Sequence, residues 1–205
     1  MWRQSRPNHN NTEWKLNVTV FQQIEDIWCT PKIDLFASRL NYQLKPYVSW
    51  HRDPGAIAVD AFSISWELGF YAFPPFSLIG RVLAKIQEEG CHGLLVAPYW
   101  TTQAWFSQLA RMLIDCPFLL TRSDKILSLP REERKQHPLK EMTLAVFPLS
   151  GDSSKAREFR EAVRISSCPH DDRPRGNNIS LTSGDGWSFV VKGVRIHTHR
   201  LLNWC

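Results

Sequence analysis

The sequence predicts an α/β fold with a Rossmann-like, doubly wound and mostly parallel sheet that helices cover. Between residues 33 and 120, short apolar runs of strand length alternate with segments whose apolar residues recur at helical spacing. Strands that are buried on both faces have continuous apolar runs of this kind. The chain has 205 residues, of which 43% are hydrophobic and nine are Trp, which is enough for one domain with a packed core.

The first elements follow from local signals. Residues 1–12 are polar and rich in Asn, which predicts a flexible lead-in. Asn17 is placed to cap a first turn, and the apolar residues after it recur at helical spacing as far as Trp28. A buried strand is expected over residues 32–37. A long polar and aromatic connection follows and ends in the turn signal at residues 53–55.

The remaining elements continue the alternation, and the predicted domain covers residues 13–148. Strands are expected at 70–73, 94–97, 118–120 and 142–148, and helices from residue 78 to Gly90 and from about residue 102.

Beyond residue 148 the pattern weakens. Residues 149–205 are rich in Ser, Arg, Asp, Asn and Gly, and predict a polar, basic tail that is poorly structured and largely disordered. Phe159 and Val163 are the only sign of a helix there. Residues 187–192 alternate like a strand, but no partner strand is evident nearby.

The positive charge lies outside the middle of the chain. Lys and Arg outnumber Asp and Glu by 15 to 10 over residues 121–205, whereas the counts are 6 and 7 over residues 33–120. A basic flank favours a polyanionic partner, because neutralising phosphates gives sequence-independent affinity. We therefore expect non-specific binding to DNA; a solvated basic tail without a partner explains the same charge.

Cysteine usage and apolar runs exclude other classes. The five Cys residues have no regular spacing, so neither a disulfide framework nor a metal site is expected. The chain does not begin with the apolar segment of a signal peptide, and no apolar run approaches the roughly 20 residues that span a bilayer. We expect an intracellular protein, nuclear or cytoplasmic, that does not contact a membrane.

The most informative motif is Phe73-Pro74-Pro75-Phe76, which lies where a predicted strand ends and a helix begins. In a doubly wound sheet, ligands bind at this end of the strands. Proline donates no backbone hydrogen bond, so two prolines stiffen the turn and leave carbonyl groups free to accept. Phe76 is then placed to stack on a flat ligand, although an aromatic residue after such a turn also commonly fills the core.

This motif resembles the Asp/Asn-Pro-Pro-Tyr/Phe loop of amino-group DNA methyltransferases. In that family the first residue and the carbonyl of the first proline accept hydrogen bonds from the adenine amino group, and the last aromatic residue stacks on the flipped base. The resemblance makes Phe73, Pro74, Pro75 and Phe76 the candidate catalytic residues. Phe73 offers no side-chain acceptor, so the stacking half of the motif is present and the polar half is missing.

Other segments resemble phage-type Dam methyltransferases in the family's order across residues 33–115. They are residues 34–38 with Asn41, residues 60–62 with Trp66, residues 95–98, and Thr101 with residues 105–106. The resemblance implies S-adenosylmethionine as cofactor. Asp34 and Asp60 are its candidate ligands, one near the methionine end and one near the ribose or adenine. A carboxylate after a strand also commonly caps the next turn, and that alternative stays open.

A closer resemblance covers residues 12–17, 33–41, 47–56 and 72–77. These segments look like the region downstream of reverse transcriptase and RNase H in DIRS-type tyrosine-recombinase retrotransposons, which carry a Dam-like domain there. The resemblance implies a degenerate adenine-N6 DNA methyltransferase from a retroelement polyprotein, with the other polyprotein domains as further partners. A non-catalytic nucleic-acid-binding module and an inert transposon remnant are the alternatives.

Overall fold

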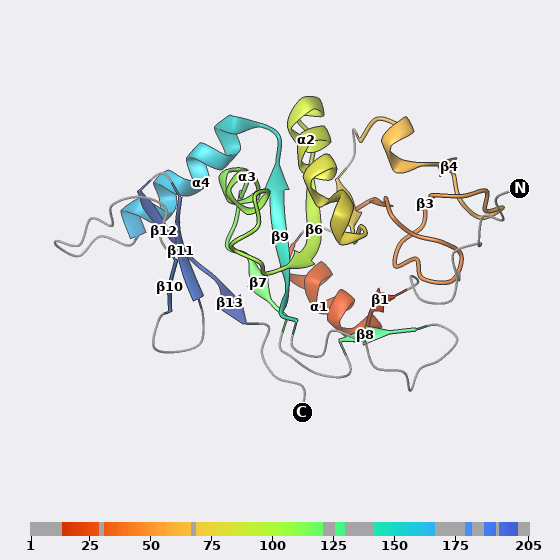
Figure 1. Ribbon diagram of the computed structural model, residues 1–205, viewed down its shortest axis with the longest axis horizontal. Coiled ribbons are helices and arrows are strands. Elements are labelled where there is room, and N and C mark those ends of the chain that lie inside the picture. The colour runs from red at the N-terminus through yellow and green to blue at the C-terminus, as the bar shows by residue number, and fades with distance from the viewer. Residues whose placement is uncertain are drawn as a thin grey trace, which may run out of the picture.

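The computed structural model describes residues 14–28, 31–66, 69–120, 126–129, 142–166, 179–181, 187–191 and 193–200. A six-stranded sheet forms the centre of this part of the chain, in the order β13-β7-β9-β6-β5-β2 (Figure 1). Its strands are β2 (Ile33–Asp34), β5 (Phe70–Ala72), β6 (His92–Pro98), β7 (Phe118–Leu119), β9 (Leu144–Ser150) and β13 (His199–Arg200).

The predicted α/β class is confirmed, but the sheet is mixed instead of mostly parallel. β2, β5 and β6 pair in parallel, as do β7 and β13. β9 pairs antiparallel with both β6 and β7, and its pairing with β6 is the longest in the sheet, running from Leu144 to Ser150. All seven residues of β9 are buried, and a fully buried strand has the same apolar pattern in either direction.

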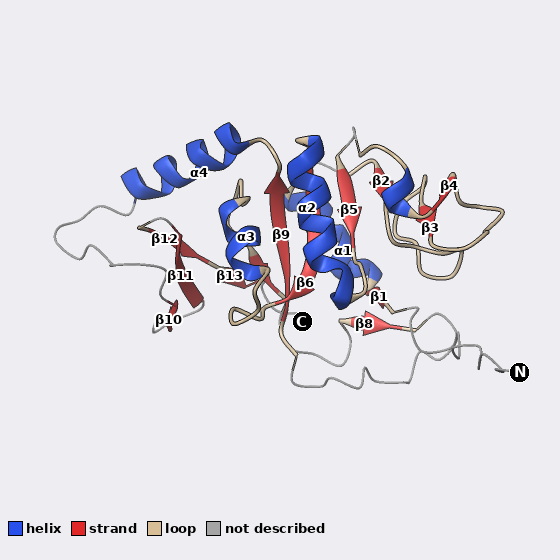
Figure 2. Ribbon diagram, turned by 45° about the horizontal axis from the view of Figure 1, so that its top comes forward, coloured by secondary structure: helices blue, strands red, loops and turns tan. Residues whose placement is uncertain are grey.

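Helices cover both faces of the sheet (Figure 2). On one face the core contains buried residues of α2 (Ile79–Glu89) and α3 (Phe106–Arg111). On the other face it contains those of α1 (Val18–Ile27). Neighbouring residues of β9 show the alternation, because Phe147 belongs to the first layer and Val146 to the second.

The helix ends follow the predicted signals. Asn17 caps α1, since its side chain accepts a hydrogen bond from the N–H of Thr19 at 2.9 Å. α2 ends at Gly90, whose φ of 67° is left-handed and suits glycine.

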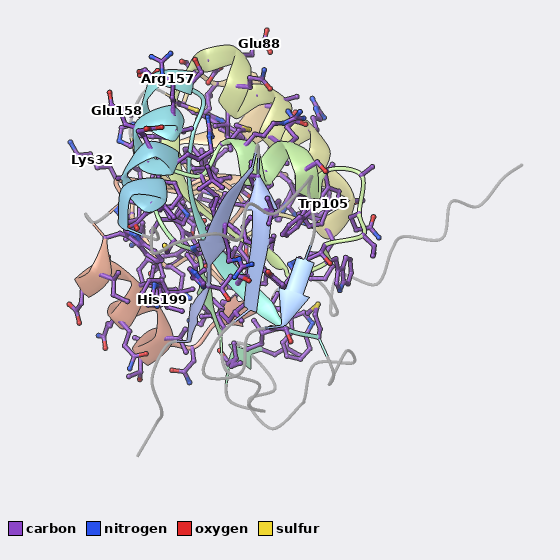
Figure 3. All side chains as sticks on the ribbon, turned by 90° about the vertical axis from the view of Figure 1, so that its left-hand side faces the viewer. Lys32, Glu88, Trp105, Arg157, Glu158 and His199 are labelled. Carbon is purple, nitrogen blue, oxygen red and sulfur yellow. The ribbon has the colours of Figure 1, made fainter. Side chains whose placement is uncertain are left out.

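The prediction of a largely disordered tail after residue 148 was wrong for the described part of it. α4 (Ser153–Ser166) packs against β9 and β12 (Val194–His197), while Arg157 and Glu158 point away from the sheet (Figure 3). The apolar residues of α4 are few, because one narrow stripe suffices for a helix that covers only one edge of a core.

The last strands also belong to the folded unit. β10 (Ile179–Leu181), β11 (Trp187–Val191) and β12 form an antiparallel sheet. The buried side chains of Phe189 and Ile196 join the core layer that contains α3. Each of these strands is short and flanked by polar residues, so the composition of the region did not predict a folded sheet. Residues 187–191, whose structure the sequence left open, form β11, and its partner strands β10 and β12 are its sequence neighbours.

Two small pairs of strands complete the described part. β1 (Lys15–Leu16) pairs antiparallel with β8 (Leu127–Ser128), and β3 (Val48–Ser49) pairs in parallel with β4 (Ala58–Val59). The predicted lead-in and the charged stretch 130–141 lie outside the described residues. Within the described residues, no helix combines the length and the apolar character needed to cross a membrane.

Candidate functional site

A cavity of about 460 Å³ lies beside the carboxyl ends of β2 and β5. Because these strands are parallel, the loops that follow them meet at the same end of the sheet. The cavity is lined mostly by apolar and aromatic side chains, with four polar ones: Trp14, Leu35, Phe36, Ala37, Ser38, Asn41, Trp50, Asp60, Ala61, Phe62, Phe73, Pro74, Pro75, Phe76, Leu78 and Arg81. The volume and the lining are those of a site for a small organic ligand.

Asp34, predicted to contact a ligand directly, does not line this cavity. Its side chain is buried, and its carboxylate accepts the N–H of Gln43 at 2.9 Å and faces the N–H groups of Phe36 and Leu44. Burial raises the pKa of Asp34 to about 7, although these N–H groups pull the pKa down. Asp34 therefore holds the loop that forms one wall of the cavity.

The same loop leaves no backbone amide for a phosphate. Every N–H from Leu35 to Leu44 is directed at an acceptor within the protein. Ser38 and Asn41 show how: the Asn41 side-chain oxygen accepts the Ser38 N–H at 2.7 Å, and the Ser38 carbonyl accepts the N–H of Asn41. A glycine-rich phosphate loop works by presenting free N–H groups, so this wall does not suit a nucleotide phosphate.

Asp60 does line the cavity, and its backbone is unusual. Its φ is 64°, a conformation that residues other than glycine rarely adopt. One carboxylate oxygen accepts the N–H of Phe62 at 3.0 Å and caps the 3₁₀-helix Ala61–Ser63. The described residues give the other oxygen no hydrogen-bond donor. Asp60 is thus both a cap and an acceptor at the cavity wall, and a strained backbone of this kind is commonest at functional sites.

The four residues of the proline motif all line the cavity. The Pro75 carbonyl accepts the N–H of Leu78 at 2.9 Å and starts the 3₁₀-helix Phe76–Leu78, which leads into α2. In the described part of the chain, the Pro74 carbonyl has no donor. Phe76 is half-buried and contacts Trp100 edge to face, with ring centroids 5.4 Å apart. The ring of Phe76 therefore both closes the core and faces the cavity.

Sequence reasoning missed the one basic residue of the lining. The guanidinium carbon of Arg81, on α2, lies 3.8 Å from the centroid of the Phe62 ring. No local signal marks Arg81, because its partner is 19 residues away and meets it only in the fold. Trp50 also lines the cavity and is 63% exposed. Trp66 is buried and donates its indole N–H to the Ala61 carbonyl, so it belongs to the core.

The sequence matches no protein-family model and no curated protein. A function must therefore be inferred from the cavity. Among the described residues, no group of three or more His, Cys, Asp or Glu side chains is placed to hold a metal ion. The cavity instead combines aromatic faces with one carboxylate, one carboxamide and one guanidinium, a set that suits a flat heterocycle carrying hydroxyl, amino or charged groups.

Proposed function

We propose that this chain is a Dam-like domain that binds S-adenosylmethionine in the cavity at the ends of β2 and β5. The observation that carries the proposal is the convergence of three sequence-distant segments, residues 36–38, 60–62 and 73–76, on one cavity. These are the segments whose residues resemble the cofactor and catalytic regions of the family. Their meeting at one cavity supports the proposal.

The direction of the strands agrees with this proposal. β2, β5, β6 and β7 run the same way, and β9 is inserted antiparallel between β6 and β7. A mixed sheet covered by helices on both faces, in which β9 runs against its neighbours, is compatible with a Rossmann-like methyltransferase sheet. The parallel pairing of β2 and β5 brings their carboxyl ends to one side, where such folds bind their ligands.

The lining fits the cofactor. S-adenosylmethionine carries an adenosine and no phosphate, and the loop after β2 likewise has no free N–H groups for a phosphate. The second carboxylate oxygen of Asp60 is available to a hydroxyl or amino group of the nucleoside. The aromatic ring of Phe36 lines the same space and suits the flat base.

When bound, the cofactor supplies an activated methyl group. For a target adenine, the Pro74 carbonyl would accept a hydrogen bond from the amino group and Phe76 would pack against the ring. Phe73 supplies no second acceptor. Removing one preorganised hydrogen-bonding group from an active site costs on the order of 10²–10³ in rate, so we propose methyl transfer to adenine N6 that is strongly impaired.

Calorimetry with S-adenosylmethionine tests the proposal, using the wild-type chain, Asp60→Asn and Asp26→Asn. Asparagine at position 60 keeps the cap on Phe62 and turns the second oxygen into a donor, so we expect at least a tenfold loss of affinity. Asp26 is exposed on α1, far from the lining, and its substitution should leave affinity unchanged. Absence of binding to the folded wild-type chain would refute the proposal.

A non-catalytic nucleic-acid-binding module is favoured by two features of the same site. Phe73 lacks the acceptor, and Trp50 is exposed at the cavity, where it can stack on a base. This function predicts DNA affinity that falls steeply with salt in a chain that does not bind S-adenosylmethionine.

A further inference from the structure

The described lining of the cavity includes one cationic side chain, Arg81, which no described carboxylate neutralises. Lys85, one turn further along α2, is paired with Glu89 instead. A cation left unpaired beside a ligand cavity is suited to an anionic group on the ligand.

The position of Arg81 is fixed by an aromatic ring. With its guanidinium carbon 3.8 Å from the centroid of Phe62, the group lies on the face of that ring. This contact occupies a face of the guanidinium and leaves its N–H groups at the edge, where they match the two oxygens of a carboxylate. Phe62 is itself held by the cap from Asp60, so the strained turn at Asp60 sets where the guanidinium lies.

The other polar side chains of the described lining carry no positive charge. Asp60 repels anions, and Ser38 and Asn41 are neutral. The N–H groups of the loop after β2 are occupied. Among the described residues that line the cavity, only Arg81 is basic.

We propose that Arg81 is the specificity-determining residue of this cavity and binds the carboxylate at the amino-acid end of the ligand, while the adenosine lies toward the aromatic rings. This inference rests on the proposed function, because it assumes that an adenosine compound occupies the cavity. It assigns the amino-acid end to α2, whereas the resemblance implied one of Asp34 and Asp60 for that end.

Three ligands separate this contact from the rest of the site: S-adenosylmethionine, S-adenosylhomocysteine and 5′-methylthioadenosine. The first two carry the carboxylate, and the third keeps the adenosine and sulfur but lacks the amino-acid end. Only the first two ligands can form a charge-assisted hydrogen bond between their carboxylate and Arg81. The wild-type chain should therefore bind them roughly tenfold or more tighter than the third. Arg81→Gln should remove this preference and leave the affinity for 5′-methylthioadenosine unchanged.

Two further variants complete the test. Arg81→Lys keeps the charge without the planar fork and should show an intermediate preference. Arg111→Gln removes an exposed Arg outside the cavity lining and should behave like the wild type. Circular dichroism of each variant checks that it is folded.

The outcomes distinguish the two proposals. If the folded wild-type chain binds none of the three ligands, the proposed function fails. If the wild type binds them and Arg81→Gln keeps the wild-type preference, or weakens all three equally, the assignment of Arg81 fails while the proposed function stands. A preference that is unchanged in Arg81→Gln, together with weaker binding to an oligonucleotide, would also overturn the assignment and place a DNA phosphate at Arg81.

Discussion

Two neighbouring regions of this molecule are stabilised by different interactions: apolar packing in one, and hydrogen bonds to carboxylates in the other. The sheet core, meaning the six-stranded sheet with α1, α2 and α3, is stabilised by alternate apolar side chains that fill two layers. The pocket segment, residues 34–66, contains short strands, turns and the 3₁₀-helix Ala61–Ser63. Its backbone is fixed by polar groups, with the carboxylates of Asp34, Asp53 and Asp60 all accepting backbone N–H groups.

This difference separates folding from binding. Leu35, Val48, Ala61 and Trp66 of the pocket segment pack into the apolar layer beside α2 and α3, but the carboxylates fix the shape of its loops. The pocket segment can change shape when one carboxylate changes its charge or its partner. Substitutions in the core should therefore act mainly on stability, and substitutions in the pocket segment on affinity as well.

The largest stability effect is expected from Phe147→Ala. Phe147 is fully buried in β9, with the rings of Tyr99 and Phe106 at 6.5 and 6.3 Å. Removing it leaves a cavity and should lower the free energy of unfolding by about 3–5 kcal/mol, measured by urea denaturation. Phe147→Leu should cost less than half of that. Ligand affinity of the folded fraction should not change, and a matching loss of affinity would show that the two regions are coupled.

The next largest effect is the pH dependence that Asp34 imposes. Its pKa is about 7 in the folded chain against a normal value of 3.8, because burial disfavours the charged form. The stability that the protonated group contributes is fully present below pH 3.8 and is lost as the pH rises toward 7. The whole shift corresponds to about 4 kcal/mol.

Comparison with Asp34→Asn isolates this effect. The variant cannot titrate at position 34, so the difference in unfolding free energy between wild type and variant should change between pH 4 and 7 and be flat above pH 8. Parallel curves for the two proteins across this range would contradict the burial of a titrating carboxylate at this position.

The sheet core was largely predictable from the sequence, and the pocket segment was not. The spacing of apolar residues predicted α1, α2 and most strands of the six-stranded sheet, since buried positions in helices and strands recur at fixed intervals. The spacing did not reveal that β9 is antiparallel to β6. The direction of a strand depends on the path of the connection that precedes it and not on which of its residues are buried.

The site was found in outline and missed in detail. Asp60 and the proline motif line the cavity because they follow strands, and their roles in binding and catalysis stay predictions. The contact of Arg81 with Phe62 and the inward turn of the Asp34 carboxylate depend on contacts between distant segments. No local pattern encodes such contacts. The sequence therefore did not predict Arg81, and it predicted a direct ligand contact for Asp34.

The smallest effects come from a matched pair of asparagines. Asn17 and Asn41 each use a side-chain oxygen to accept a backbone N–H, from Thr19 in the first case and from Ser38 in the second. Replacing either by Ala should cost about 1 kcal/mol in the free energy of unfolding. Only Asn41 lines the cavity, so only Asn41→Ala should also weaken binding of S-adenosylmethionine in calorimetry. Equal affinities in the two variants would mean that the pocket segment keeps its shape without this hydrogen bond, and that its carboxylates alone define the wall.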